Sequence, residues 1–543
     1  AGEAKAAAAP SLWRWRRRRR RPAAATASTS GCTWEEVVNI QAMGWAPPML
    51  CDVVWAETPK PEVRDQLPRE QVALLELRGC RLPAGMERAL RRNLDCSMRY
   101  TFDSKAKKFA AAFSSPYGAA AGPLDDADVL IVPLLPGVYA DAPSESLPTE
   151  LLFLFQVVGE IIEREQRYIT VVLLTSGSSG PAMVSASPDR PSAAGPLRGL
   201  VRVARLEQPL LPLLCVDTDA FGLGGDALQL ATQVQCELRA TDGTMEVAYR
   251  KNRRYALRVK LSARNLIRAG CQPPSLAWAG EGGCVLITGG LGGLGVVTAE
   301  ALAEAGANCI VLVSRSGNVA RDGQGLQERL QELAEAGVQV VKERCDTSSE
   351  KQVSAMLQRV RQSHGPLRVV VHAAGVLDDK LFVRQDADSM RRSFAAKADG
   401  AWHLHKHTQE DSLELFCCYS SIAALYGNFG QANYASSNTY LDELCQWRAA
   451  KGLPSISIQW PGIAEVGMAA AMGQKVKVAE DLTLSVAGVK QVVRQLAAGT
   501  APVSPVLVVT TAGLLVPHQR QHASMLQPLL GPCVEGYDVG GQE

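Results

Sequence analysis

A glycine-rich turn between an apolar strand and a helix constrains the fold of this chain more than any other feature. The run Thr288-Gly-Gly-Leu-Gly-Gly-Leu-Gly295 follows the apolar segment Cys284–Thr288 and precedes a predicted helix at 296–305. Its glycines fit the pattern GxGxxG, which permits a tight turn, close approach of a pyrophosphate, and packing of the helix on the strand. The helix N-terminus then offers free N–H groups to the phosphates. We therefore expect a bound dinucleotide, with contacts from Thr288, Gly290, Leu291, Gly292, Leu294 and Gly295.

Apolar strands alternate with helical segments on both sides of a Gly- and Pro-rich segment at 271–282, which is predicted to be a linker. Such alternation is typical of a parallel sheet with crossover helices. Residues 283–511 are therefore predicted to form a doubly wound α/β subdomain with strands at 284–288, 308–314, 338–345, 367–372, 413–421, 455–460 and 506–510. Residues 46–270 are predicted to form a truncated Rossmann-like α/β subdomain without a cofactor turn. Its predicted strands lie at 51–55, 72–77, 128–135, 168–174 and 212–216, with a hairpin at 246–250 and 255–259.

Composition and charge exclude several function classes. The 543 residues include 57 basic and 55 acidic side chains, a net charge of +2 that gives no whole-chain attraction to nucleic acid or membrane. The 14 cysteines are scattered without a CxxC pair, so we expect neither a disulfide framework nor a metal site. This cysteine usage favours a reducing compartment. No apolar run reaches the length of a membrane helix. We expect a cytoplasmic protein.

Both ends of the sequence are predicted to be tails. Residues 1–45 carry the run Arg16–Arg21 among small and polar residues, which is typical of disorder. Three roles remain open for this tail: a solvated extension, a leader of the kind that directs proteins to plastids, and a basic patch for nucleic acid. Residues 512–543 are predicted to be irregular. Because the sequence begins at Ala1, we expect a fragment or a processed form.

Residues at the ends of the next strands indicate which dinucleotide binds. An NAD-binding chain usually places a carboxylate at the end of the second strand, whereas this chain has Ser314 and Arg315. Arginine pairs with the 2′-phosphate of NADP, which a carboxylate would repel, so the sequence favours NADPH. Asp346 follows the third strand and is predicted to accept a hydrogen bond from the adenine amino group. Ala373, Ala374 and Gly375 close the fourth strand and leave room for the nicotinamide ribose.

A strand-end serine and a helical tyrosine suggest reduction of a carbonyl group. Ser421 ends a predicted strand, and Tyr434 and Asn438 lie four residues apart on one face of a predicted helix. A tyrosine held by a serine suits proton transfer to a carbonyl oxygen as hydride reaches its carbon. Its pKa near 10 calls for a nearby cation. Short-chain dehydrogenases carry that lysine at the position of Asn438, so either the site is inactive or the lysine comes from elsewhere.

Lys397 resolves this difficulty through a resemblance to a known family. The lysine lies in Phe394-Ala-Ala-Lys-Ala-Asp-Gly-Ala-Trp402, and the stretch 419–438 resembles the ketoreductase domain of modular type I polyketide synthases. In that family lysine and asparagine exchange places. The resemblance implies that Tyr434 donates the proton, Ser421 holds the carbonyl oxygen, Lys397 lowers the tyrosine pKa and Asn438 completes the relay. It also implies cofactor contacts from Pro461 and Gly462.

The resemblance extends to the first half and to stereochemistry. The stretches 199–209 and 215–219 resemble signature segments of the family's structural subdomain. Leu377, Asp378 and Asp379 match the Leu-Asp-Asp loop of B-type ketoreductases, which form a D-configured 3-hydroxyl group. Tyr426 stands where the opposite type carries tryptophan, and a substrate helix is implied near Met468. Phe429 in place of proline, and Pro461 between Trp460 and Gly462, depart from the family pattern.

Together these features predict an NADPH-dependent 3-ketoacyl reductase. The resemblance implies a substrate carried as a thioester on the phosphopantetheine arm of an acyl carrier protein, in polyketide or fatty acid biosynthesis, and partner domains of a larger synthase. Two alternatives remain open at this stage. One is a reductase of a free small carbonyl compound, and the other is an inactive ketoreductase-like scaffold within a synthase assembly.

Overall fold

The computed structural model describes residues 49–510 except for 63–70, 78–79, 81, 83, 95–97, 112–123, 125–126, 135–141, 179, 181–189, 221–224, 262–275, 277–281, 321–323, 469–482 and 498–503. The predicted tails at 1–45 and 512–543 lie outside the described residues, as does most of the predicted linker.

The C-terminal half, which we define as residues 284–510, is a doubly wound parallel sheet. Its strand order is β12-β11-β10-β13-β14-β15-β18, and every neighbouring pair is parallel. The α/β prediction is therefore confirmed. The strands are β10 (Cys284–Thr288), β11 (Cys309–Ser314), β12 (Gln339–Arg344), β13 (Leu367–His372), β14 (Leu415–Ser421), β15 (Ile456–Trp460) and β18 (Val506–Thr510). The helices that concern the site are α6 (Gly293–Glu304), α7 (Leu326–Glu335), α8 (Glu350–His364), α9 (Ala387–Phe394), α10 (Gly400–His407), α11 (Ala423–Tyr426), α12 (Ala432–Ala450) and α14 (Val486–Ala497).

The N-terminal half, which we define as residues 49–261, repeats this plan on a smaller scale. Five strands pair in parallel in the order β8-β7-β6-β5-β2: β8 (Glu246–Arg250), β7 (Leu213–Thr218), β6 (Thr170–Thr175), β5 (Val129–Pro133) and β2 (Val72–Glu76). Helices α2 (Ala84–Leu94), α3 (Ser146–Glu165), α4 (Leu197–Glu207) and α5 (Ala227–Arg239) cover this sheet. The edge strand β4 (Lys108–Ala111) and its neighbour β3 (Met98–Asp103) were not predicted, because their short sequences mix charged and apolar residues without the buried apolar run of a central strand.

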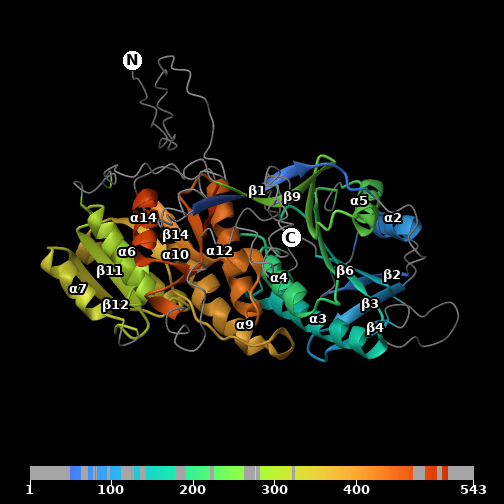
Figure 1. Ribbon diagram of the computed structural model, residues 1–543, viewed down its shortest axis with the longest axis horizontal. Helices are drawn as coiled ribbons and strands as arrows, with labels where there is room; N and C mark the ends of the chain where they lie inside the picture. The colour runs from blue at the N-terminus through green and yellow to red at the C-terminus, as the bar shows by residue number, and fades with distance from the viewer. Residues whose placement is uncertain are drawn as a thin grey trace, which may run out of the picture.

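The first strand departs from the predicted parallel arrangement. β1 (Met49–Thr58) pairs antiparallel with β18 on one edge and with β9 (Arg253–Leu261) on the other. Cys51 lies opposite Val508 and Leu261. An apolar run does not encode strand direction, so reading this segment as the first strand of a parallel series was wrong. As a result the two halves share one 16-stranded sheet, and β1 crosses between them in Figure 1.

Helices α4 and α12 pack side by side where the halves meet (Figure 1). Gly199 on α4 lies so close that an added Cβ would be 2.3 Å from the Ala435 carbonyl oxygen of α12. Hydrogen bonds from the Ser436 and Thr439 hydroxyls to the Pro196 carbonyl oxygen, at 2.8 Å and 3.1 Å, reinforce this contact. Only a residue without a side chain fits at position 199, because its neighbour is rigid backbone.

We expect Gly199→Ala to lower the free energy of unfolding by about 2–3 kcal/mol, since overpacking against backbone outweighs the higher helix propensity of alanine. Gly85→Ala is the matched control: Gly85 also lies on a helix, but an added Cβ there meets no atom within 4 Å. That variant should be neutral or slightly more stable. Urea unfolding of both variants measures the difference, and equal stabilities would contradict the close packing of α4 on α12.

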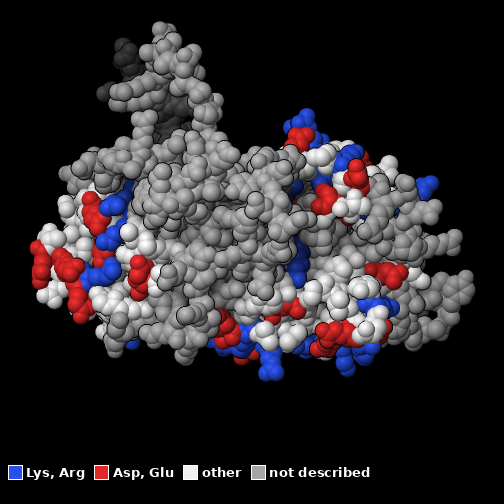
Figure 2. All heavy atoms as spheres, viewed as in Figure 1, with Lys and Arg blue, Asp and Glu red and all other residues white. Residues whose placement is uncertain are grey.

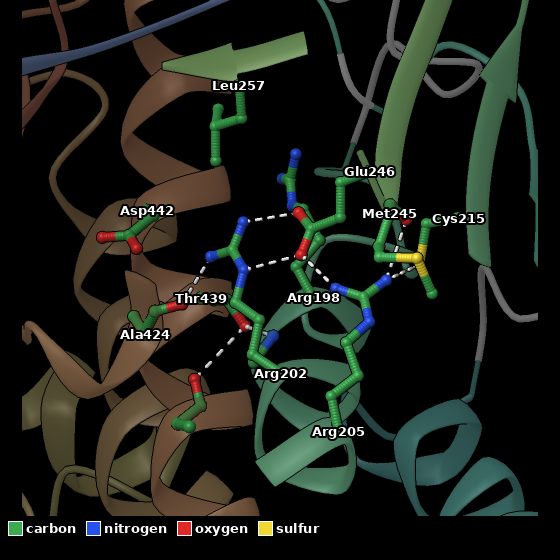
Figure 3. A network of polar contacts seen from close by, with 12 residues as sticks. Arg198, Arg202, Arg205, Cys215, Met245, Glu246, Leu257, Ala424, Thr439 and Asp442 are labelled. Atoms are coloured by element: carbon green, nitrogen blue, oxygen red, sulfur yellow. Dashed lines mark hydrogen bonds and ion pairs between the residues drawn. The ribbon is translucent and has the colours of Figure 1, made fainter. Parts of the chain in front are cut away.

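A buried ion cluster ties α4 to both halves of the chain. Figure 3 shows the Arg202 guanidinium between the Glu246 carboxylate, at 2.6 Å, and the Ala424 carbonyl oxygen, at 2.5 Å. Arg205 also contacts Glu246, at 2.9 Å. Burial alone would raise the pKa of Glu246, but the charges of the two arginines hold it at about 2. Arg202 thereby connects a strand of the N-terminal half to α11 of the C-terminal half.

The surface carries charges of both signs. On the face drawn in Figure 2, Lys and Arg side chains lie interspersed with Asp and Glu side chains over the described residues. None of the described helices is long and apolar enough to cross a membrane.

Candidate active site

One cavity of about 940 Å³ lies at the carboxyl ends of the central strands of the C-terminal half. This is the position at which open parallel sheets bind their ligands. Of the predicted residues, the cavity lining contains Leu291, Gly292, Leu294, Gly295, Ser314, Arg315, Asp346, Ala373, Ala374, Gly375, Leu377, Lys397, Ser421, Tyr426, Tyr434, Pro461, Gly462 and Met468. Most of the predicted cofactor turn and three of the four predicted catalytic residues therefore meet in a single space.

The glycine turn has the close contacts that its sequence predicted. An added Cβ at Gly295 would lie 2.5 Å from the Gly289 carbonyl oxygen, and one at Gly290 would lie 2.5 Å from the Ile287 carbonyl oxygen. The N-cap residue of α6, Gly292, supplies no side-chain cap to the first turn of this helix. Its free N–H groups and the positive end of its dipole suit an anion. The turn thus fits the pyrophosphate of a dinucleotide.

Two predicted residues of this turn do not reach the cavity. Gly290 packs beneath the turn, and Thr288 is fully buried with its hydroxyl 2.7 Å from Nδ1 of His372. Thr288 does not line the cavity, because the last side chain of β10 turns toward β13, and its contact with the cofactor stays a prediction. Nε2 of His372 lies 3.0 Å from the Lys397 carbonyl oxygen and donates to it, so Nδ1 accepts from Thr288.

The far end of the cavity carries the residues predicted to select the cofactor. Arg315 is exposed, and no acidic side chain among the described residues pairs with its guanidinium. The Ser314 hydroxyl accepts a hydrogen bond from the Gly317 N–H at 3.0 Å. Oδ1 of Asp346 accepts hydrogen bonds from the backbone N–H and hydroxyl of Ser348, at 3.0 Å and 2.8 Å. An unpaired guanidinium at this place fits a phosphate group.

Lys397 enters the cavity from an irregular turn of helix. Residues Ala395–Asp399 form a π-helical turn between α9 and α10, a geometry that often occurs at functional sites. The side chain is 3% exposed. Nζ donates to the Tyr419 carbonyl oxygen at 2.9 Å and lies 5.1 Å from the centre of the Tyr434 ring. Burial lowers the pKa of Lys397 to about 8. Lys397 therefore lies beside the tyrosine, and its predicted effect on the tyrosine pKa stays a prediction.

Ser421 and Tyr434 line the same part of the cavity as Lys397. Tyr434 is 8% exposed, and burial raises its pKa, whereas its neighbours Asn438 and Ser421 lower it in part through hydrogen bonds. The Ser421 hydroxyl accepts the Ala423 N–H at 3.2 Å and is also hydrogen-bonded to Tyr434. Asn438 lies behind the cavity wall, where its Nδ2 donates to the Tyr434 carbonyl oxygen at 2.8 Å.

The Leu-Asp-Asp loop borders the cavity, but only its leucine lines it. Asp378 forms an ion pair with Arg392 at 2.5 Å. Asp379 accepts a hydrogen bond from the Gln431 amide at 3.1 Å, and burial followed by the charge of Asp378 raises its pKa. Both carboxylates thus contact side chains around the cavity, Arg392 and Gln431, and neither lines the cavity itself.

Sequence reasoning missed several lining residues, among them Leu206, Arg392, Gln431 and Gly467. Leu206 comes from α4 of the N-terminal half, so no local pattern near the turn or the tyrosine could have revealed it. Among the described residues, no group of three or more His, Cys, Asp or Glu side chains could hold a metal ion.

Comparisons with known proteins agree with this site. Residues 283–465 match the family model of the KR domain. A phenolphthiocerol/phthiocerol polyketide synthase of Mycobacterium tuberculosis is 37% identical over 304 residues, which cover 55% of this chain and 16% of that protein. Polyketide synthase GfsA of Streptomyces halstedii is 37% identical over 301 residues, which cover 54% of this chain and 4% of that protein. The chain thus spans a small part of these relatives. They are bacterial and give no support to a plastid leader.

Solved structures share the fold over most of the chain. A-type ketoreductases from a modular polyketide synthase give a TM-score of 0.67 at 24% identity, covering 85% of this chain and 93% of that chain. The ketoreductase from the first module of phoslactomycin biosynthesis in Streptomyces sp. HK803 gives a TM-score of 0.64 at 24% identity, covering 89% and 98%.

The fold comprises two Rossmann-like subdomains, and the cavity of the second one fits a dinucleotide. More narrowly, residues 283–465, about a third of the chain, match the KR domain, and the similar proteins named above are polyketide synthases and their ketoreductases.

Proposed function

We propose that this chain reduces a 3-ketoacyl thioester, carried on the phosphopantetheine arm of an acyl carrier protein, to the 3-hydroxyacyl thioester with NADPH. The convergence of Lys397, Ser421 and Tyr434 on the cavity that the glycine turn opens supports this proposal. In the same proposal residues 46–270 are a structural subdomain, 283–511 the catalytic subdomain, and other polyketide synthase domains the partners.

The proposal gives each residue in and behind the cavity wall a role in this reaction. NADPH, when bound at the glycine turn, supplies a hydride to the 3-carbon. The Ser421 hydroxyl donates to the 3-carbonyl oxygen in place of its hydrogen bond to Tyr434. Tyr434 transfers its phenolic proton to that oxygen: the C=O π bond breaks, the hydride forms the new C–H bond, the proton forms the new O–H bond, and the C–O single bond remains. Lys397 stabilises the phenolate that remains, and Asn438 supports the return of a proton to it.

NADPH oxidation with a short 3-ketoacyl thioester, free and carrier-bound, tests the proposal. We expect turnover and, from the Leu377-Asp378-Asp379 loop with Tyr426, a D-configured 3-hydroxyl group as in B-type ketoreductases. Turnover confined to free small carbonyl compounds would favour the reductase alternative. NADPH binding without any turnover would favour an inactive scaffold, and absence of NADPH binding would refute the cofactor assignment.

We expect Arg315→Ser to weaken NADPH binding about 10–100-fold and to leave NADH binding unchanged, because hydrogen bonds to a charged group contribute about 1.5–3 kcal/mol. Fluorescence titration with both cofactors measures this. Arg359→Ser is the control, since Arg359 pairs with Glu343 at 2.8 Å on the surface and does not line the cavity. An equal loss for NADH and NADPH would contradict a role in reading the 2′-phosphate.

A further inference from the structure

One carboxylate of the N-terminal half joins two loops of the catalytic site. Glu207 is the last residue of α4. Its Oε2 accepts a hydrogen bond from the Phe382 N–H at 2.6 Å, and its Oε1 accepts one from the Gly430 N–H at 2.8 Å. Phe382 follows the Leu-Asp-Asp loop, and Gly430 precedes Tyr434 by four residues. A single side chain therefore spans the loop beside the substrate space and the turn that leads to the tyrosine.

The same two segments contact one another directly. The Lys380 N–H donates to the Gly430 carbonyl oxygen at 2.9 Å, and the Gln385 amide donates to that oxygen at 3.2 Å. Gln156 of α3 donates to the Phe382 carbonyl oxygen at 2.8 Å. The N-terminal half thus holds Phe382 at both its N–H and its carbonyl group, and Glu207 links Gly430 to the same anchor.

A short chain of hydrogen bonds connects these two segments to Tyr434. The Asn433 amide donates to the Asp378 carbonyl oxygen at 2.9 Å, and its oxygen accepts the Tyr434 N–H at 2.7 Å. Gln431, next to Gly430, donates to Asp379 and lines the cavity. A shift of Gly430 relative to Phe382 would therefore change the distance between the Leu-Asp-Asp loop and Tyr434.

The location of Glu207 is electrostatically unfavourable for α4 itself. A carboxylate at a helix C-terminus faces the negative end of the helix dipole. No Lys, Arg or His of the described residues forms an ion pair with it. The hydrogen bonds found for its carboxylate come from the two loop N–H groups, and such charge-assisted bonds are stronger than neutral ones.

We propose that Glu207 is a positioning residue that sets the geometry between the Leu-Asp-Asp loop and Tyr434, and thereby the face on which the ketone is reduced. This inference rests on the proposed function. It assigns to the N-terminal half a role in stereochemical outcome in addition to its structural role.

Glu207→Gln tests this proposal, because the amide keeps the size of the side chain but turns an N–H₂ group toward one of the two loop N–H groups. We expect kcat/KM for the thioester to fall at least about ten-fold and the share of the minor enantiomer to rise about ten-fold, the effect of losing one hydrogen bond to a charged group. The Kd for NADPH should stay unchanged, since Glu207 does not line the cavity near the glycine turn.

Glu145→Gln is the matched control. Glu145 also bridges the two halves, but it pairs with the Arg391 side chain at 2.9 Å and contacts neither loop. We expect normal kinetics and product configuration for this variant. Hydrogen exchange read by mass spectrometry over 380–385 and 427–434 gives a measurement independent of turnover: exchange should accelerate about ten-fold in Glu207→Gln and not in Glu145→Gln.

The possible outcomes separate this inference from the proposed function. Faster exchange with unchanged kinetics and product configuration would overturn the positioning role, and so would a loss shared equally by the control. If the wild-type chain reduces no thioester, the proposed function fails. Exchange then still decides whether Glu207 holds the two loops, and unchanged exchange overturns this.

Discussion

Tyr434→Phe is expected to lower kcat for thioester reduction about 1000-fold, within the range of about 10²–10⁴ contributed by a positioned acid or base. The variant keeps the ring beside Lys397 and removes only the phenolic proton that the carbonyl oxygen receives. The Kd for NADPH should change less than about three-fold, because the glycine turn and Arg315 lie away from the phenol. Steady-state NADPH oxidation and a separate binding titration measure the two effects.

Tyr440→Phe provides the control on the same helix. Tyr440 is buried to a similar degree on α12, and burial raises its pKa, but it does not line the cavity. Its replacement should leave kcat within a few-fold of the wild-type value. Retention of more than a tenth of the wild-type kcat in Tyr434→Phe would contradict the assignment of Tyr434 as proton donor.

Lys397→Met is expected to abolish most turnover and at the same time to stabilise the fold. Burial lowers the pKa of Lys397 to about 8 from an ordinary value of 10.5, so the folded protein binds this proton less tightly than the unfolded chain. Below pH 8 the buried charge costs about 3 kcal/mol, at 1.36 kcal/mol per pKa unit. Methionine removes this cost but leaves the Tyr419 carbonyl oxygen without its donor. We expect a net gain of about 1–3 kcal/mol at pH 7 and at least a 100-fold loss in kcat.

The stability difference between Lys397→Met and the wild type is expected to depend on pH. Between about pH 8 and 10.5 the unfolded chain holds more protons than the folded one, so raising the pH stabilises the wild type through this group. The advantage of Lys397→Met should therefore shrink as the pH rises through this window. Lys406→Met is the control, because Lys406 is half exposed and pairs with Glu350 at 2.6 Å on the surface. A Lys397→Met variant that is less stable than the wild type at pH 7 would contradict the cost assigned to the buried charge.

Local sequence patterns predicted most of the C-terminal half. The bounds of β10, β13 and β18 agree with the prediction to the residue, because a buried parallel strand is a short apolar run bounded by turn residues. The glycine turn and the spacing of Tyr434 and Asn438 depend on backbone geometry within a few residues. Such local geometry can be predicted from the residue types and their spacing. The preference for NADPH and the B-type stereochemistry stay predictions.

Local sequence patterns could not predict contacts between residues that are far apart in the sequence. The placement of Thr288 beneath the cavity, toward His372, depends on β10 and β13 being neighbours in the sheet. The antiparallel pairing of β1 with β18 joins residues more than 450 positions apart. The hydrophobic periodicity of a segment indicates whether a strand is buried, but not which strand it pairs with.

The sequence by itself determined the α/β class and predicted the dinucleotide turn and the catalytic residues, because each is expressed in local spacing or in a family resemblance. The tertiary structure alone decided that both halves share one sheet, that a π-helical turn brings Lys397 beside Tyr434, and that Glu207 reaches the loops around that tyrosine. The physical reason is that these contacts depend on which surfaces are buried against one another. Hydrophobic burial is non-directional, so a local sequence pattern does not specify the partner surface.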